Sequence, residues 1–148
     1  MAAIPPVCDF GAPIKNFALP DPATGKTVTL ADVKGKNGTL VMFICNHCPY
    51  VLAEIDRIVR DAKELQALGV GIVAISANDV EAYPEDAPDL MVKMAGKTGF
   101  SFPYLYDETQ ATARDFDAVC TPDFFGYNAA GDLQYRGRLD ASRREAGP

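Results

Sequence analysis

The clearest pattern in the chain is an amphipathic segment in its first half. Hydrophobic side chains recur at intervals of three or four residues over 51–68, and charged residues such as Glu54 occupy the positions between them. This spacing predicts a helix with one buried face and one charged, exposed face. Pro49 suits the first turn, because proline has no N–H group to leave unpaired there, and Gly69 ends the helix.

Two apolar runs flank this helix and predict the centre of a sheet. Residues 40–44 and 70–76 lack polar alternation, which is typical of strands that are covered on both faces. A strand, a helix and a second strand in succession form a βαβ unit, so these two strands are expected to be parallel. Further short strands and helices are expected at 102–106, 123–127 and 133–138, and at 90–97 and 108–118 respectively.

Turn signals indicate two hairpins. Asn128–Asp132 separates the last two predicted strands and has the composition of a hairpin turn, which makes this end of the sheet antiparallel. Near the N-terminus, Gly25-Lys26 lies between two short extended pieces, 16–19 and 27–30, and predicts a β-hairpin. Residues 1–12 are rich in proline and form an irregular leader.

Composition excludes several classes of function. The 148 residues suit a single domain, 1–148. Lys and Arg number 14 against 20 Asp and Glu, and the net charge of −6 argues against nucleic-acid or membrane-surface partners. No apolar run approaches the roughly 20 residues that span a bilayer. The first residues lack the basic and apolar regions of a secretory signal, so a cytoplasmic location is expected.

The candidate chemistry lies where the first buried strand meets the helix. Cys45 and Cys48 stand three positions apart at this junction. Unpaired N–H groups and the helix dipole favour a thiolate, which is the nucleophilic form of cysteine. Lowering a thiol pKa from about 8.5 to about 7 needs about 2 kcal/mol. The dipole supplies about 0.3–1 kcal/mol, so amide hydrogen bonds and a protonated His47 are expected to add the rest.

The spacing also suits disulfide formation, because residues three apart at a helix start lie about 5–6 Å apart. Cys45, at the exposed turn, is expected to attack a substrate, and Cys48, one turn further in, to resolve the mixed disulfide. This interpretation needs neither an organic cofactor nor a metal ion. Two alternatives remain open: both thiols could be core residues, or they could join Cys120 and His47 in a metal site, as in a copper(I)-binding chaperone.

Polar residues are also expected around these cysteines from the next loop. Parallel strands end at the same edge of a sheet, so the loop that follows Ser76 should open beside Cys45. The alternative is that this loop is only a solvated connection. Its polar residues are Asn78, Asp79, Tyr83, Glu85 and Asp86.

Three segments, 43–51, 102–110 and 119–125, resemble the thioredoxin superfamily. More narrowly, they resemble the redoxin group of the alkyl hydroperoxide reductase/thiol-specific antioxidant (AhpC/TSA) family, over roughly residues 12–139. The resemblance implies a thioredoxin-like α/β fold, in which a mixed central sheet of about five strands carries helices on both faces and follows an N-terminal β-hairpin. It implies a thiol–disulfide oxidoreductase of antioxidant or redox-homeostasis type, which acts on protein or small-molecule thiols and disulfides.

The same resemblance assigns further residues to the site. Cys45 would be the attacking thiol, Cys48 the resolving thiol, and Pro122 a cis proline that faces their disulfide. The backbone of Thr121 would then pair with a bound peptide. Together with the residues expected from the helix start and the sheet edge, the tuning or rim residues are Asn46, His47, Pro49, Cys120 and Asn78.

Two departures from the family pattern qualify these expectations. True peroxiredoxins carry proline, three residues, Thr or Ser, two residues, then Cys, and neither Cys45 nor Cys48 is preceded by that pattern. Hydroperoxide reduction, through a sulfenic acid at Cys45, is therefore the alternative activity. Residues 141–148 are also too short for the C-terminal helix that usually closes the fold. Either the chain is incomplete, or a second subunit covers the open face in a homodimer.

Overall fold

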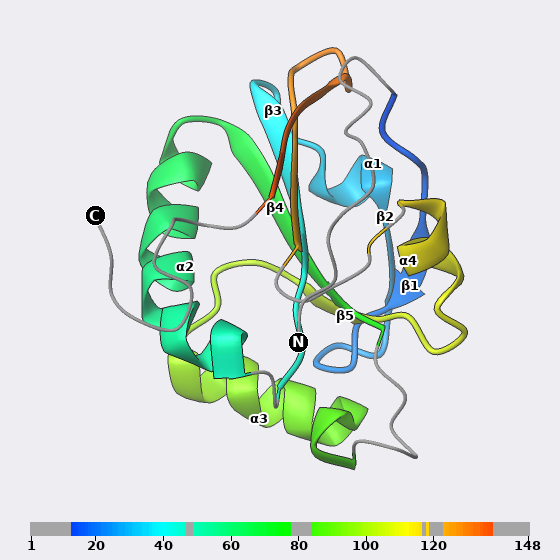
Figure 1. Cartoon of the computed structure of the whole chain (residues 1–148), viewed down its shortest axis with the longest axis vertical. Helices are drawn as coiled ribbons and strands as arrows, with labels where there is room; N and C mark the ends of the chain where they lie inside the picture. The colour runs from blue at the N-terminus through cyan, green and yellow to red at the C-terminus, as the bar shows by residue number, and fades with distance from the viewer. Residues whose placement is uncertain (1–12, 47–48, 78–83, 117, 119–122, 138–148) are drawn as a thin grey trace.

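A five-stranded mixed sheet forms the centre of the molecule (Figure 1). The computed structural model describes residues 13–46, 49–77, 84–116, 118 and 123–137. The strands lie in the order β5-β4-β3-β6-β7, with β3, β4 and β5 parallel and with β6 and β7 antiparallel to their neighbours. Their bounds are β3 Gly38–Phe43, β4 Val70–Ser76, β5 Tyr104–Tyr106, β6 Asp123–Tyr127 and β7 Leu133–Gly137.

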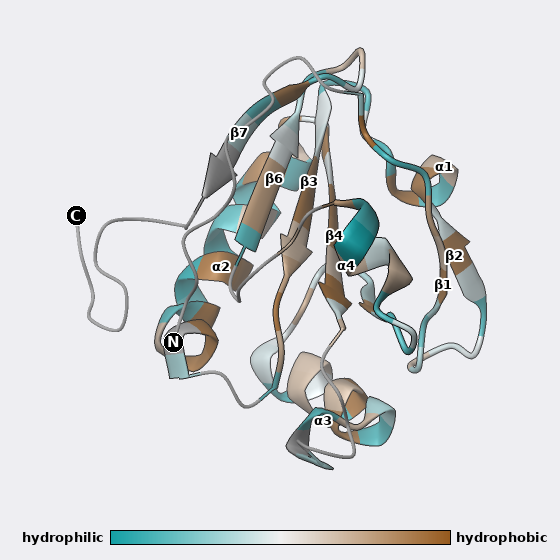
Figure 2. Cartoon of the chain, turned by 45° about the vertical axis from the view of Figure 1, so that its right-hand side comes forward, coloured by the Kyte–Doolittle hydropathy of each residue, from teal (hydrophilic) through white to brown (hydrophobic). Residues whose placement is uncertain are grey.

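Helices cover both faces of this sheet, as the sequence predicts. The long helices α2 (Pro49–Ala67) and α3 (Pro88–Thr98) pack on one face. The other face is covered by α1 (Leu30–Val33), α4 (Ala111–Asp115) and a separate hairpin of β1 (Ala18–Pro20) and β2 (Thr27–Thr29). Two hydrophobic cores therefore lie on opposite sides of one sheet (Figures 1 and 2).

The central strands are hydrophobic because both of their faces are buried (Figure 2). In β3, Val41 and Phe43 pack toward the hairpin side, whereas Met42 packs toward α2 and α3. The register pairs Phe43 with Ile75, and the Ile44 N–H group then donates to the Ile75 carbonyl oxygen at 3.0 Å. Pairing thus continues to the residue before Cys45 and fixes the starting point of the next turn.

Several elements have the predicted bounds, and others differ. The strands 70–76 and 123–127 are confirmed, and in the turn between β6 and β7 the Asn128 side-chain oxygen accepts the N–H groups of Ala130 and Asp132 at 3.0 Å. The predicted helix over 108–118 is shorter, because Gln110 takes a left-handed conformation with φ of 65° before α4 begins.

Helix α1 was not predicted from the sequence. The second extended piece ends at Thr29, whose N–H group donates to the Asp32 carboxylate at 2.9 Å. This contact closes a single helical turn that is too short to show hydrophobic periodicity. The irregular leader 1–12 and the predicted absence of a C-terminal helix concern residues outside the described part. Within that part, no helix is both long enough and apolar enough to cross a membrane.

The loop after α1 packs its backbone directly against β4. A Cβ atom on Gly71 would overlap the Val33 carbonyl oxygen and the backbone of Gly35, and one on Gly35 would overlap the backbone of Gly71. Neither position has room for a side chain, and the obstructing atoms are backbone atoms that do not move independently. This contact fixes the segment that precedes β3 against the start of β4.

We predict that Gly71→Ala lowers the free energy of unfolding by about 2–3 kcal/mol, because the added methyl group overpacks this contact. Urea denaturation measures the change. Gly96→Ala is the matched control: it lies in α3, nothing lies within 4 Å of its Cβ position, and alanine there should add about 0.5–1 kcal/mol. Equal stability of Gly71→Ala and the wild type would show that the loop can move away from β4.

Candidate active site

Cys45 lies at the carboxyl end of β3 and is completely buried, at 0% exposure. It belongs to the same hydrophobic core as Val51 at the start of α2, Met91 of α3 and Phe124 of β6. The prediction of an exposed turn at Cys45 is therefore wrong for this conformation. Strand pairing persists through Ile44, so Cys45 still lies in the core between the sheet and the helices α2 and α3.

The residue after Cys45 is held by two buried side chains from other elements. The Asn46 backbone N–H group donates to Asp86 Oδ1 at 2.7 Å, and the Tyr104 hydroxyl donates to Asn46 Oδ1 at 3.0 Å. Asp86 closes the single-turn helix η1 (Pro84–Asp86), and Tyr104 begins β5. Asp86 is 0% and Tyr104 4% exposed. Three chain segments that are distant in sequence therefore meet beside Cys45.

This arrangement confirms the prediction for the loop after Ser76 and changes the prediction for the amide groups near Cys45. The loop that follows Ser76 does bring a polar side chain to the turn after Cys45, namely Asp86. The first N–H group after Cys45, however, points at the Asp86 carboxylate. Any stabilisation of a Cys45 thiolate by amides must therefore come from groups other than the Asn46 N–H.

Tyr104 is a neutral hydrogen-bond donor in this environment. Burial raises the pKa of Tyr104 well above its ordinary value of 10.0, and negative charges at Cys45 and Asp86 raise it further. The nearby hydroxyl of Ser76, which is buried at the end of β4, has a smaller opposite effect on this pKa. Tyr104 thus keeps its proton and its hydrogen bond to Asn46 throughout the physiological pH range.

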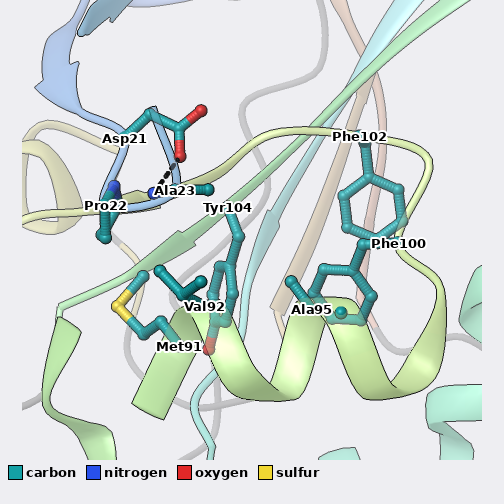
Figure 3. A pocket seen from close by; sticks show the side chains of 10 residues that line it. Asp21, Pro22, Ala23, Met91, Val92, Ala95, Phe100, Phe102 and Tyr104 are labelled. Carbon is teal, nitrogen blue, oxygen red and sulfur yellow. Dashed lines mark hydrogen bonds between the residues drawn. The ribbon is translucent and has the colours of Figure 1, made fainter. Parts of the chain in front are cut away.

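The Tyr104 ring also lines a cavity (Figure 3). Its volume is about 280 Å³, and it is formed by α3, β5 and the turn between β1 and β2. Phe100 and Phe102 stack in its wall with ring centroids 4.6 Å apart, and at its rim the Asp21 carboxylate accepts the Ala23 N–H at 3.0 Å. Tyr104 therefore contributes its ring to an apolar cavity and its hydroxyl group to the residue after Cys45.

A second buried acid lies on α2. Glu54 is 1% exposed, and its Oε1 atom lies 3.9 Å from Nη2 of Arg57. The prediction that Glu54 belongs to the exposed face is wrong. Glu54 follows Val51 by three residues and precedes Ile58 by four, so it falls on the same buried stripe as these two core residues.

Of the other predicted site residues, the structure describes Pro49. Pro49 begins α2 and is exposed, as expected for a proline in a first turn. The remaining ones lie outside the described residues: His47, Cys48, Asn78, Cys120, Thr121 and Pro122. Their predicted roles, including the cis proline and the metal alternative, stay predictions. Among the residues that are described, no group of three or more His, Cys, Asp or Glu side chains could hold a metal ion.

Sequence reasoning missed Tyr104 and Ser76. Ser76 ends β4 and Tyr104 begins β5, and both strands run parallel to β3 toward the edge where Cys45 stands. The rule that parallel strands end at the same edge could have been applied to these strand residues as well as to the loop after Ser76. The signal was a serine at the end of the apolar run 70–76 and a tyrosine in the predicted strand 102–106.

We predict that Tyr104 contributes to the pH dependence of stability in alkali. Its folded-state pKa is raised, so its contribution is complete below the unfolded-state pKa of about 10 and is lost as the pH rises above that value. Urea denaturation between about pH 9 and pH 11 should show a shallower decline for Tyr104→Phe than for the wild type. The same decline in both proteins would contradict the shift, provided that circular dichroism at neutral pH shows both folded.

The family is shown by comparison with known proteins. Residues 10–136 match the model of the AhpC/TSA family. A conserved protein from Geobacillus kaustophilus is 44% identical, with a TM-score of 0.95 over 100% of this chain and 78% of that one. A hypothetical protein from Sinorhizobium meliloti is 35% identical, with a TM-score of 0.92 over 97% and 78% of the two chains.

A more distant likeness extends to disulfide enzymes. A secreted disulfide oxidoreductase from Mycobacterium tuberculosis is 19% identical, with a TM-score of 0.66 over 80% of each chain, which shows a shared fold. No curated protein matches the sequence. The family match spans most of the chain and agrees with the mixed sheet, its two helical layers and the cysteine at its edge. The chain therefore belongs to the AhpC/TSA family and has a thioredoxin-like fold.

Proposed function

We propose that the protein is a thiol–disulfide oxidoreductase that works through Cys45 and Cys48. The observation that carries this proposal is the position of Cys45, between β3 and α2, beside a turn that Asp86 and Tyr104 hold through Asn46. Burying polar side chains is costly unless they are hydrogen-bonded, and a cysteine that only fills the core would not need them there. Membership of the AhpC/TSA family supports thiol-based redox chemistry.

The proposed reaction transfers two electrons between a dithiol and a disulfide. The Cys45 thiolate attacks one sulfur of the substrate disulfide, which breaks the substrate S–S bond and releases one substrate thiolate that takes up a proton. The Cys48 thiolate then attacks Cys45 in the mixed disulfide and releases the second substrate thiol. The substrate is reduced, and the protein is left with a Cys45–Cys48 disulfide; the reverse sequence oxidises a substrate dithiol.

Burial of Cys45 adds a condition to the first step. A sulfur with no exposed surface has to become accessible before a substrate disulfide can reach it. The residues that cover Cys45 must therefore move, and the observed rate is reduced by the fraction of molecules in which the sulfur is accessible. Protein or small-molecule disulfides are the proposed substrates, and no organic cofactor takes part.

We predict that Cys45→Ser abolishes reduction of a disulfide-bonded peptide by the dithiol form of the protein. Cys48→Ser should instead accumulate a mixed disulfide with the peptide, because the resolving thiol is missing. Mass spectrometry of acid-quenched, non-reduced samples distinguishes these outcomes. Cys8→Ser is the matched control and should turn over like the wild type. Normal turnover by Cys45→Ser would remove this assignment.

The same variants test the two alternative activities. The peroxiredoxin spacing is missing before Cys45, so rapid mixing with hydrogen peroxide should oxidise Cys45 no faster than an ordinary thiolate. A much faster formation of sulfenic acid would favour hydroperoxide reduction over disulfide exchange as the activity of the protein. Stoichiometric copper in the reduced protein as purified would favour a metal carrier instead.

A further inference from the structure

Helix α3 and the turn between β1 and β2 do not fill the space between them. The part of α3 that borders this space carries Val92, Ala95 and Gly96, which have the spacing of one helical face. Ala95 and Gly96 are small, and no atom lies within 4 Å of the position that a Gly96 Cβ atom would take. Together with residues 100–104, these elements enclose a cavity of about 280 Å³, which we call the α3 cavity (Figure 3).

The α3 cavity has a buried end and an exposed mouth. Met91, Phe102 and Tyr104 line it and are buried in the hydrophobic core between the sheet and the helices α2 and α3. Val92 and Ala23 also line it, and both are exposed at the surface. A small molecule can therefore enter from solvent and bury its surface against side chains that the core holds in place.

The rings that line the cavity favour an aromatic ligand. Phe100 stacks on Phe102 with ring centroids 4.6 Å apart, and the rings of Phe100 and Tyr104 are tilted by 55° with centroids 5.4 Å apart. Aromatic rings attract a further ring in an offset stack or edge-on, and the sulfur of Met91 also packs favourably against aromatic edges. The Tyr104 hydroxyl group donates to Asn46, so Tyr104 offers a ligand its ring and not its polar atom.

The charges around the cavity favour a neutral ligand. Among the described residues that line it, no lysine, arginine or histidine occurs, so an anion would lose its hydration without gaining a partner. Asp21 is the one charged residue of this lining, and it stands at the rim. Its carboxylate accepts the Ala23 N–H group at 3.0 Å and so stabilises its own turn.

The volume of the cavity sets the size of the ligand. An engineered apolar cavity of about 150 Å³ in another protein takes up benzene, whereas sites for drug-sized ligands span about 300–1,000 Å³. The α3 cavity lies between these sizes, at about 280 Å³. A molecule of one aromatic ring or two fused rings therefore fits, and a nucleotide or a flavin does not.

We propose that the α3 cavity binds a small, neutral aromatic molecule of one or two fused rings. The occupant is a free molecule and not a side chain of a partner protein. A protein partner needs a wider apolar surface around its anchoring side chain, and Val92 is the one large hydrophobic residue of the described lining that is exposed. This binding site does not depend on the redox role proposed for Cys45, and its test measures no disulfide exchange.

Indole is the probe, because it is neutral and consists of two fused rings. Titration of the full chain, followed by nuclear magnetic resonance of isotope-labelled methionine methyl groups, should show saturable binding. A dissociation constant of about 0.1–1 mM is expected for a ligand of this size. The indole ring should shift the methyl signal of Met91, assigned with Met91→Leu, more than that of Met42, which belongs to the same core but does not line the cavity.

Gly96→Leu places a side chain in the cavity and should weaken indole binding by about tenfold or more, because the side chain and the ligand compete for the same space. The variant should remain folded, since the Cβ position is open and leucine is a better helix former than glycine. Lys93→Leu is the matched control: it adds the same side chain to an exposed position of α3 outside the cavity lining and should bind indole like the wild type.

Three further probes test the class of ligand. Indole-2-carboxylate adds a negative charge to the same rings and should bind about tenfold more weakly than indole, or worse. Tighter binding of tryptamine would assign a cation to Asp21, and tighter binding of N-acetyltryptophanamide would assign the side chain of a partner protein; either result overturns the proposal. It is also overturned if indole does not saturate the protein, if the Met91 signal does not move, or if Gly96→Leu binds indole like the wild type.

Discussion

Parallel pairing of β3 with β4 is the interaction on which the site depends. It runs in register from Gly38 and Val70 to Phe43 and Ile75, and it is extended by the Ile44 N–H group. Because both strands end together, the turn after β3 and the loop after β4 leave the sheet side by side. That shared edge brings the Asp86 carboxylate, from the loop after β4, to the N–H group of Asn46, which follows β3, although 40 positions separate the two residues.

The site combines two properties that oppose each other. The proposed function requires Cys45 to meet a substrate, yet Cys45 lies in the same hydrophobic core as Val51 and Phe124. Burial shields a thiol from oxidants and unspecific disulfides, and the proposed reaction therefore depends on motion of the residues that cover Cys45. Asp86 and Tyr104 hold the backbone and the side chain of Asn46, the residue that directly follows this thiol.

The parts of the structure that could be predicted from the sequence are those set by local periodicity. The runs over 70–76 and 123–127 are strands because their apolar residues fill the two cores, and α2 follows from its spacing of hydrophobic residues. The spacing of Glu54 from Val51 and Ile58 is compatible with the buried stripe, but its burial could not be predicted, because it depends on how wide an arc of α2 the sheet and α3 cover. The contact between Tyr104 and Asn46 joins residues 58 positions apart and exists only once β5 has paired with β4.

The position of Tyr104 has an optical consequence. The chain contains no tryptophan, so its ultraviolet fluorescence comes from tyrosine, without energy transfer to an indole. Tyr104 is held in a dry environment with its ring against a cavity and its oxygen on the neighbour of Cys45. The emission of this side chain is sensitive to that hydrogen bond, so Tyr104, one of six tyrosines, reports on the contact between β5 and the residue after Cys45.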